Sequence, residues 1–203
     1  MTAGAAVREA FDRRAEPGRA VAGDAEAIAR ACHAMAVRFH AGGRLIVFGN
    51  GGPCADAQHV AVEFVHPVVV GKRALPAFAL TGDVATLTAI ALAEGFDEVF
   101  AAQLRTLARP DDIALGLSAD GRCANVRRGL AAADAMGLLT VALTGGDGDM
   151  DGAAGRSIDH VLRARTADPL VAKEVHVTVY HLLWELVHVF FEHPGTLRRE
   201  TSR

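Results

Sequence analysis

Short, uninterrupted apolar runs alternate with longer segments of helical periodicity through most of this chain. Runs of four or five apolar residues are typical of strands covered on both faces. Clear runs span residues 45–48, 77–80, 113–117 and 139–143, and a weaker one spans 158–162. The segments between them have apolar residues at helical spacing and cover 55–65, 84–93, 98–107 and 124–136. Strands that alternate with helices form right-handed βαβ units, so we predict an α/β fold with a parallel sheet between helical layers.

Helical patterns also occupy the N-terminal part of the chain. The segment Glu16-Pro17-Gly18 is a helix breaker, so we expect a short helix over about 5–15 and a separate, longer one over Asp24–His40. The longer helix has apolar residues at the spacing of one buried face, namely Ile28, Cys32, Met35 and Phe39.

A final helix is expected over about 171–191. It carries more apolar residues than a single stripe needs, which indicates burial on more than one side and suggests a subunit interface. We therefore predict a single domain over residues 1–203, with N-terminal helices (about 1–41) and this long C-terminal helix.

The composition excludes several classes of function. Of the 203 residues, 51% are hydrophobic, which is enough for a sizeable core, and the formal net charge is −3. A chain without a basic field does not attract nucleic acid or anionic lipid, so we expect no direct contact with nucleic acid. The apolar stretches are too short to span a membrane. Three cysteines without CxxC spacing, and a charged N-terminus without an apolar core, favour the cytoplasm.

Two loops follow predicted strands and have the composition of ligand-binding turns. The first is Gly49-Asn50-Gly51-Gly52-Pro53, and the second is Ser118-Ala119-Asp120-Gly121. In open parallel sheets, ligands bind beyond the carboxyl ends of the strands. Glycine lets the backbone approach a ligand, and the helix that follows begins with free N–H groups that can bind an anion. A glycine-rich turn without a ligand is the simpler alternative for each loop.

A longer series of motifs surrounds these loops. Gly49-Asn50-Gly51-Gly52 is followed by Asp56-Ala57-Gln58-His59 and then by Glu63. The remaining motifs are, in order, Leu75–Thr81, Leu87–Ile90, Gly95-Phe96, Val99-Phe100, Leu143–Gly145, Asp147-Gly148, Lys173–His176 and His181. In this order and spacing the segments resemble the phosphoheptose isomerases of the sugar isomerase (SIS) domain superfamily, over about residues 25–190.

The resemblance implies a three-layer sandwich with a five-stranded parallel sheet of flavodoxin-like topology. It also implies a homotetramer with active sites between subunits and a small-molecule substrate, because members convert sedoheptulose 7-phosphate into an aldoheptose phosphate. No nucleotide cofactor is implied, whereas some members hold zinc. The residues that the resemblance assigns to the substrate and its phosphate lie in the two loops, and they are Asn50, Gly51, Gly52, Ser118, Asp120 and Cys123.

For catalysis, the resemblance assigns the base to Glu63 and the acid to His181. Isomerisation between an aldose and a ketose needs a base that moves a proton between adjacent carbons and an acid near the oxygens. His59 and Glu63 lie four residues apart on one helix and, with His181, form the implied zinc site. The alternative is an ordinary helix-face pair of His59 and Glu63, with His181 as an interface histidine.

Several positions depart from the family pattern where the ligand is expected. The second loop continues to Arg122-Cys123 and reads Ser-Ala-Asp-Gly-Arg-Cys, where the family has Ser-Thr-Ser-Gly-Asn-Ser. A carboxylate, Asp120, therefore stands where the phosphate is expected, and two like charges about 4 Å apart repel by about 1 kcal/mol even in water. Other family residues are replaced by Pro53, which lacks an N–H donor, by Pro67 (or His66) and by Leu92-Ala93. Lys173 replaces a glutamine that ligates zinc, and a protonated lysine cannot ligate.

Two further groups have alternative interpretations. Cys54 and Cys123 each follow a ligand loop and are either small buried residues or, with Asp120, a soft metal or redox site. Glu174 and His181 lie seven residues apart, nearly aligned on a helix, so Glu174 could replace the missing glutamine as a ligand.

Three functional hypotheses follow from these residues. The first is a phosphoheptose-isomerase-like enzyme, which the family resemblance favours. The second is a non-catalytic SIS protein that binds sugar phosphates or proteins, as relatives that bind the replication initiator DnaA do. The third is an isomerase for a different, less anionic substrate, in which Asp120 and Arg122 set the specificity.

Overall fold

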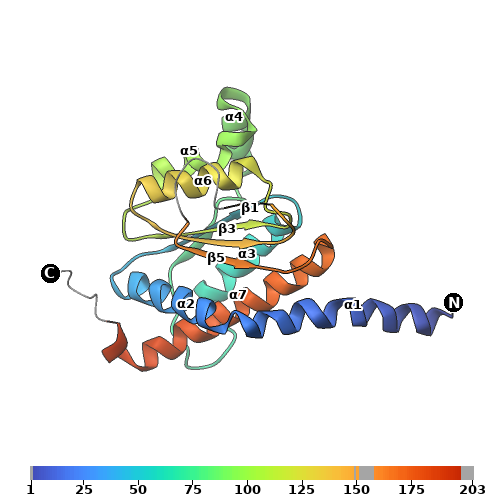
Figure 1. Cartoon of the computed structure of the whole chain (residues 1–203). Helices are drawn as coiled ribbons and strands as arrows, with labels where there is room; N and C mark the ends of the chain where they lie inside the picture. Colours follow the sequence, from blue (N-terminus) through green and yellow to red (C-terminus); the bar gives the residue numbers. More distant parts are fainter. Residues whose placement is uncertain (1, 149, 151–157, 198–203) are drawn as a thin grey trace.

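The computed structural model of the chain describes residues 2–148, 150 and 158–197, and Figure 1 shows its ribbon. A single five-stranded sheet contains β1 (Leu45–Gly49), β2 (Ala77–Ala79), β3 (Ile113–Ser118), β4 (Leu139–Thr144) and β5 (His160–Arg163). The strand order is β2-β1-β3-β4-β5, and every neighbouring pair is parallel. The predicted α/β sandwich with a five-stranded parallel sheet is therefore confirmed. Residue 1 and residues 198–203, at the ends of the predicted domain, lie outside the described residues.

The register of the sheet brings the two predicted ligand loops together. β1 and β3 pair from Leu45↔Ile113 to Gly49↔Leu117. The chain moves from β1 to one neighbour, β2, and later returns to the other side of β1 as β3, which makes this pair the topological switch point. The turns after Gly49 and Ser118 therefore lie side by side, at the crevice where such sheets bind ligands.

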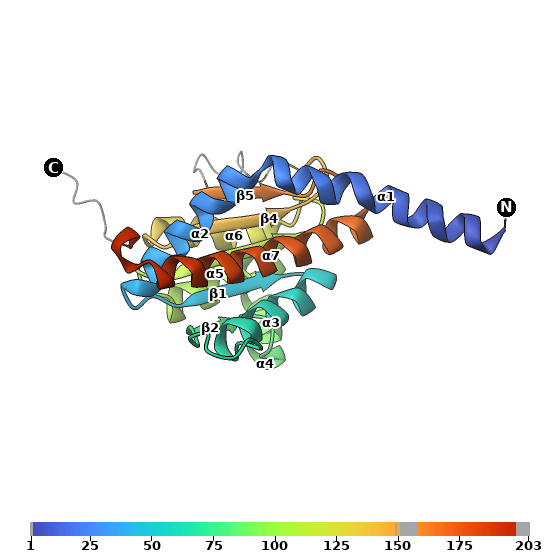
Figure 2. The ribbon, with the colours of Figure 1, turned by 90° about the horizontal axis from the view of Figure 1, so that it is seen from below.

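Helices cover both faces of the sheet. On one face lie α1 (Ala3–Gly23), α2 (Ala25–His40), α3 (Gly52–Val65) and α7 (Pro169–Glu192), and on the other lie α4 (Val84–Glu94), α5 (Val99–Leu107) and α6 (Ala124–Ala135) (Figures 1 and 2). Alternate residues of each strand enter the two cores: Leu45 and Val47 face α2, α3 and α7, whereas Ile46 and Phe48 face α5 and α6. Because both faces are covered, all five residues of β1 are buried, as its uninterrupted apolar run predicts.

The predicted break near Pro17 is wrong, because α1 runs without interruption from Ala3 to Gly23. Proline removes one helical hydrogen bond, but Pro17 and Val21 are buried, and Arg14 forms an ion pair with Glu174 of α7 (Nε–Oε2 2.8 Å). Packing against α7 therefore compensates for the local cost. The helix predicted over 98–107 is confirmed as α5 (Val99–Leu107), and a 3₁₀ turn, η1 (Phe96–Glu98), precedes it. A second turn, η2 (Pro194–Thr196), follows α7.

The long C-terminal helix is confirmed and is buried on several sides, as its apolar excess predicts. Within this chain α1, α2 and α3 all pack against α7, and these contacts account for buried residues such as Val175, Val179 and Leu183. No helix within the described residues is both long and apolar enough to cross a membrane.

α4 differs from every other helix in its surroundings. It is rich in apolar residues, yet none of its residues is buried, and it stands away from the body of the molecule in Figure 1. Leu92 is 90% exposed and Val84 is 67% exposed. The N-terminal half of α1 likewise extends beyond the sheet (Figure 2) and exposes Val7 and Phe11.

Candidate active site

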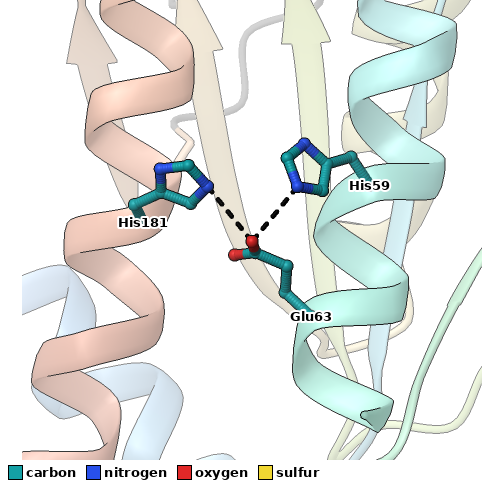
Figure 3. Close-up of side chains that lie close together, drawn as sticks. All are labelled: His59, Glu63 and His181. Carbon is teal, nitrogen blue, oxygen red and sulfur yellow. Dashed lines mark hydrogen bonds and ion pairs between the residues drawn. The ribbon is translucent and has the colours of Figure 1, made fainter. Parts of the chain in front are cut away.

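Three side chains predicted from the sequence meet between α3 and α7. His59 Nε2 lies 3.1 Å from Glu63 Oε1, and His181 Nε2 lies 3.2 Å from the same oxygen (Figure 3). Each residue offers a ligand atom, and all of these atoms lie within 4.8 Å of one another. His59 and Glu63 are one helical turn apart on α3, and His181 approaches from α7, which begins more than 100 residues later in the chain. The two histidines are exposed, whereas Glu63 is half-buried.

α3 and α7 run in the same direction, because their contacts advance together along both helices. Near the N-termini Lys173 meets Asp56, further along both helices Tyr180 meets His59, and beyond them Trp184 Nε1 donates to the Glu63 carbonyl oxygen (3.0 Å). The Trp184 bond fixes the backbone that carries the proposed base. The shared N-terminal end of both helices lies beside the first glycine turn.

The Tyr180 hydroxyl lies 2.9 Å from His59 Nδ1. Its ring makes edge contacts with both histidines, with centroid distances of 5.5 Å to His59 and 4.9 Å to His181. Burial, together with the charges of Asp56 and Glu63, raises the pKa of Tyr180 well above its usual value. The hydroxyl therefore keeps its proton at neutral pH.

Lys173 forms an ion pair with Asp56, and its ammonium also lies 3.3 Å from the Gly52 carbonyl oxygen. Asp56 is 4% exposed, so the pair places a positive charge over a buried carboxylate at the start of α3. The cation is thus directed to Asp56 and the glycine turn rather than to the cluster of His59, Glu63 and His181.

His176 lies near this ion pair and is 1% exposed. Neither of its ring nitrogens has a hydrogen-bond partner, and the same is true of Asp56 Oδ2. Burial lowers the pKa of His176; the nearby Asp56 carboxylate acts in the opposite direction, and Lys173 adds to the lowering. The imidazole is therefore neutral in the folded protein near pH 7.

The first ligand loop is tied to the second by a pair of amides. Asn50 Nδ2 donates to Asn125 Oδ1 (2.6 Å), and Asn125 Nδ2 donates to Asn50 Oδ1 (3.0 Å). Position 49 accepts only glycine, because a Cβ atom there would lie 2.8 Å from the Leu117 carbonyl oxygen of β3. Gly51 has φ +62° and caps α3, and Pro53 occupies the first turn of that helix, where a missing N–H costs nothing within the helix.

The second loop hydrogen-bonds to its own carboxylate. Asp120 Oδ1 accepts from Ser118 Oγ (3.2 Å) and from the Arg122 N–H (2.9 Å), while Ser118 Oγ accepts from the Gly121 N–H (3.0 Å). The Ser118 hydroxyl and one loop amide, groups that suit a phosphate oxygen, are therefore already bound to an anion of the chain itself. Asp120 is exposed at the mouth of the loop, so a ligand can reach and displace it.

The remaining predicted ligands lie elsewhere. Arg122 pairs with Asp147 (2.6 Å), and Glu174 pairs with Arg14, so neither of these two joins the His–Glu cluster. Among the described residues, Cys54, Cys123 and Asp120 do not form a group close enough to share a metal ion, and the three cysteines are free thiols. Within the described residues, the structure therefore does not support the alternatives in which Glu174 replaces the missing glutamine or in which Cys54, Cys123 and Asp120 hold a metal ion.

Sequence patterns do not reveal Tyr180, Asp56 or Asn125 as parts of the site. Asp56 stands inside the quoted motif, but its ion pair with Lys173 depends on the rotation of α3 and α7 about their axes. The one signal that could have pointed to Tyr180 is its position directly before His181, together with the fact that the chain has no other tyrosine.

Comparisons with known proteins agree with this fold. A family model described as an SIS domain matches residues 14–145. The phosphoheptose isomerase of Solidesulfovibrio magneticus is 43% identical over 169 residues, which cover 83% of this chain and 81% of that protein. A solved phosphoheptose isomerase from Francisella tularensis has a TM-score of 0.86 and 30% identity, covering 93% of this chain and 100% of that one. The phosphoheptose isomerase structure from Neisseria gonorrhoeae has a TM-score of 0.83 and 31% identity, covering 92% and 98%.

Proposed function

The chain belongs to the phosphoheptose isomerase family of SIS-domain proteins, and from this premise we propose that it is an aldose–ketose isomerase for sedoheptulose 7-phosphate or a close analogue. The observation that carries the proposal is the meeting of Glu63 with His59 and His181, at one carboxylate oxygen, between α3 and α7. This group combines a carboxylate base with N–H donors in one place, as isomerisation requires.

Glu63 acts as the base in this proposal. Its carboxylate removes a proton from C1 of the open-chain ketose and returns it to C2, so the carbonyl moves from C2 to C1 through an enediol. His181 supplies a proton to the oxygen on C2 and accepts one from the oxygen on C1, so protons balance over the cycle. His181 is exposed and 3.2 Å from Glu63, which places acid and base within reach of two adjacent carbons.

The phosphate end of the substrate belongs at the paired loops after β1 and β3. Gly51 and Gly52 leave room for an anion at the N-terminus of α3, and Asn50, held by Asn125, lies beside them. On the β3 side, the substrate phosphate displaces the Asp120 carboxylate from Ser118 Oγ and the Arg122 amide. Cys123 begins α6 at the end of this loop.

The chemistry of His59, Glu63 and His181 fits a zinc ion. Two imidazoles and one carboxylate, with an open fourth position, are ligands of catalytic zinc, and their three ligand atoms lie close enough to share one ion. When bound, zinc would polarise substrate oxygens as a Lewis acid. Lys173, in the place of the family's glutamine, adds no fourth ligand, because its ammonium is bound to Asp56.

We also propose that the protein forms a homotetramer and that it is located in the cytoplasm. The support is the uncovered apolar surface of α4 and of the N-terminal half of α1, which another copy of the chain could bury. A hollow of about 610 Å³ between α4, α5 and β2, lined by residues such as Phe78, Ile90 and Leu107, adds to this surface. The free thiols fit a reducing compartment.

The proposal is tested by incubating the purified chain with sedoheptulose 7-phosphate in deuterium oxide. We expect an aldoheptose phosphate that carries deuterium at C2, because the base exchanges its proton with solvent. Glu63→Gln should lower the rate by about 10²-fold or more, since it removes the base. Glu185→Gln, on the exposed side of α7, is the matched control and should leave the rate unchanged. Turnover that survives in Glu63→Gln would refute the assignment of the base.

One observation favours a second candidate, a non-catalytic sugar-phosphate-binding protein. Asp120 occupies donors of the loop that a substrate phosphate would use. If the wild-type chain is stabilised against heat by sedoheptulose 7-phosphate but shows neither product nor deuterium exchange, with or without added zinc, the binding function replaces the enzymatic one.

A further inference from the structure

Tyr180 is a buried residue in contact with the proposed catalytic group. Its side chain is 1% exposed, yet its hydroxyl points to His59 Nδ1 at 2.9 Å, and its ring lies against both histidines. A buried tyrosine hydroxyl needs a hydrogen-bond partner, and here His59 is that partner. The hydroxyl therefore connects the packed interior of α7 to a residue at the surface of the site.

The partners on the two sides of His59 fix the direction of the hydrogen bonds. The Glu63 carboxylate can only accept, so His59 Nε2, at 3.1 Å from Oε1, carries the proton of that bond. In a neutral imidazole Nδ1 is then an acceptor, and the Tyr180 hydroxyl is its donor. The result is one chain of bonds in a single direction, from Tyr180 through His59 to Glu63.

We infer that Tyr180 is a positioning residue, whose hydroxyl holds His59 in the Nε2–H tautomer and in the ring orientation that directs this proton at Glu63 Oε1. The role of Tyr180 in catalysis rests on the proposed isomerase function. Both histidines approach Oε1, so the carboxylate is oriented with its other oxygen, Oε2, available to the carbon-bound proton of a substrate.

The same hydroxyl suits a metal-bound form of the site. A hydroxyl group can donate or accept, so it can accept from His59 Nδ1–H when Nε2 serves as a ligand. Outer partners of this kind orient ligating histidines, and their loss typically reduces metal affinity or activity by about 10- to 100-fold. A phenylalanine at this position could provide neither bond.

The test compares Tyr180→Phe with the wild-type chain. The variant retains the ring and its packing and removes only the oxygen. We expect kcat to fall by about tenfold with little change in KM, and zinc affinity to fall by a similar factor. In ¹⁵N-histidine NMR spectra of the metal-free protein, the His59 signals, assigned by their loss in His59→Asn, should change from the Nε2–H tautomer to a mixture of tautomers.

Thr178→Val is the matched control, because the Thr178 hydroxyl lies on the same helix and donates only to the Glu174 carbonyl oxygen (3.2 Å). It should leave kcat, zinc affinity and the His59 signals unchanged. The inference would be overturned if His59 kept the Nε2–H tautomer in Tyr180→Phe. It would also be overturned if His59 had the Nδ1–H tautomer in the metal-free wild-type protein, and this second measurement does not depend on whether the variant folds. If the wild-type chain shows no isomerase activity, the proposed function fails, whereas the tautomer and the zinc affinity still decide the role of Tyr180.

Discussion

At the scale of single residues, the site keeps the His59, Glu63 and His181 cluster that the family resemblance implies, and it also carries charged residues that depart from the family pattern. The His59–Glu63 pair could be predicted, because a spacing of four on a helix places two side chains together whatever the fold around them. The Tyr180–His59 and Lys173–Asp56 contacts could not, because each joins α3 to α7 across more than 100 residues of sequence. Two of the charged departures from the family pattern, Asp120 and Lys173, now have defined partners, and each leads to a prediction.

Replacing Asp120 by serine should strengthen phosphate binding. The substitution removes a negative charge from the loop, and a like charge about 4 Å away costs about 1 kcal/mol in water, which corresponds to roughly fivefold in affinity. We expect KM for sedoheptulose 7-phosphate to fall several-fold, with a smaller effect at high salt. Asp12→Ser, on the exposed part of α1, is the control for a change in net charge. A rise in KM for Asp120→Ser would instead indicate that the carboxylate recognises the substrate.

Replacing Lys173 by glutamine should strengthen zinc binding and weaken the fold. It removes a positive charge from the helix that carries His181 and supplies an amide oxygen, so we expect zinc affinity to rise at least about fivefold. Asp56, with 6% of its side chain exposed, loses its counter-charge, so the free energy of unfolding should fall by about 1–3 kcal/mol. Zinc titration by calorimetry and urea unfolding of the metal-free protein measure the two effects. Unchanged zinc affinity would show that position 173 is remote from the metal.

At the scale of secondary-structure elements, the strands and most helices could be predicted because their signal is periodic and local. The apolar runs of β1, β3 and β4 became fully buried strands, since both faces of the sheet are covered there, whereas β2 and β5, at the two edges, are only partly buried. The helix break predicted at Pro17 is wrong because the packing of α1 against α7, a contact between distant parts of the sequence, outweighs the local effect of the proline. The helix α7 also packs against α2 and α3, and one of its buried residues makes stability depend on pH.

His176 should make the fold less stable as the pH falls below about 6.5. Burial lowers the pKa of His176 in the folded state, so between the folded value and the unfolded value of about 6.5 the unfolded chain binds more protons. The stabilising contribution is therefore present above about pH 6.5 and is lost as the pH falls through the folded pKa. Urea unfolding at pH 7.5 and 5.5 measures this loss, which should be smaller in His176→Leu. Part of the dependence should remain, because burial also lowers the pKa of His160. An equal loss in both proteins would show that His176 does not titrate between these pH values.

At the scale of the whole molecule, exposed apolar side chains lie on the projecting helices α1 and α4, and also over residues 62–70, at the end of α3 and in the segment that follows it. The core of each face is closed by helices of the same chain, so this surface contributes little to folding of one copy. α4 has no buried residue, and Phe96, just beyond it, is 60% exposed. Burial of such surface is worth about 25 cal/mol per Å², so its removal from water favours association.

A charge on α4 should therefore dissociate the proposed oligomer without unfolding the chain. Leu92→Lys places an ammonium at a side chain that is 90% exposed in a single copy, so a monomer tolerates it, whereas an apolar interface does not. Sedimentation equilibrium should give a tetramer for the wild-type chain and a smaller species for Leu92→Lys, with circular dichroism unchanged. Arg127→Glu, on the sheet-flanking helix α6, is the control for a surface charge change and should remain tetrameric. A monomeric wild-type chain would refute the oligomer, and a tetrameric Leu92→Lys would place the interface away from α4. If the active site is shared between subunits, as in the family, the dissociated variant should lose isomerase activity together with its tetramer.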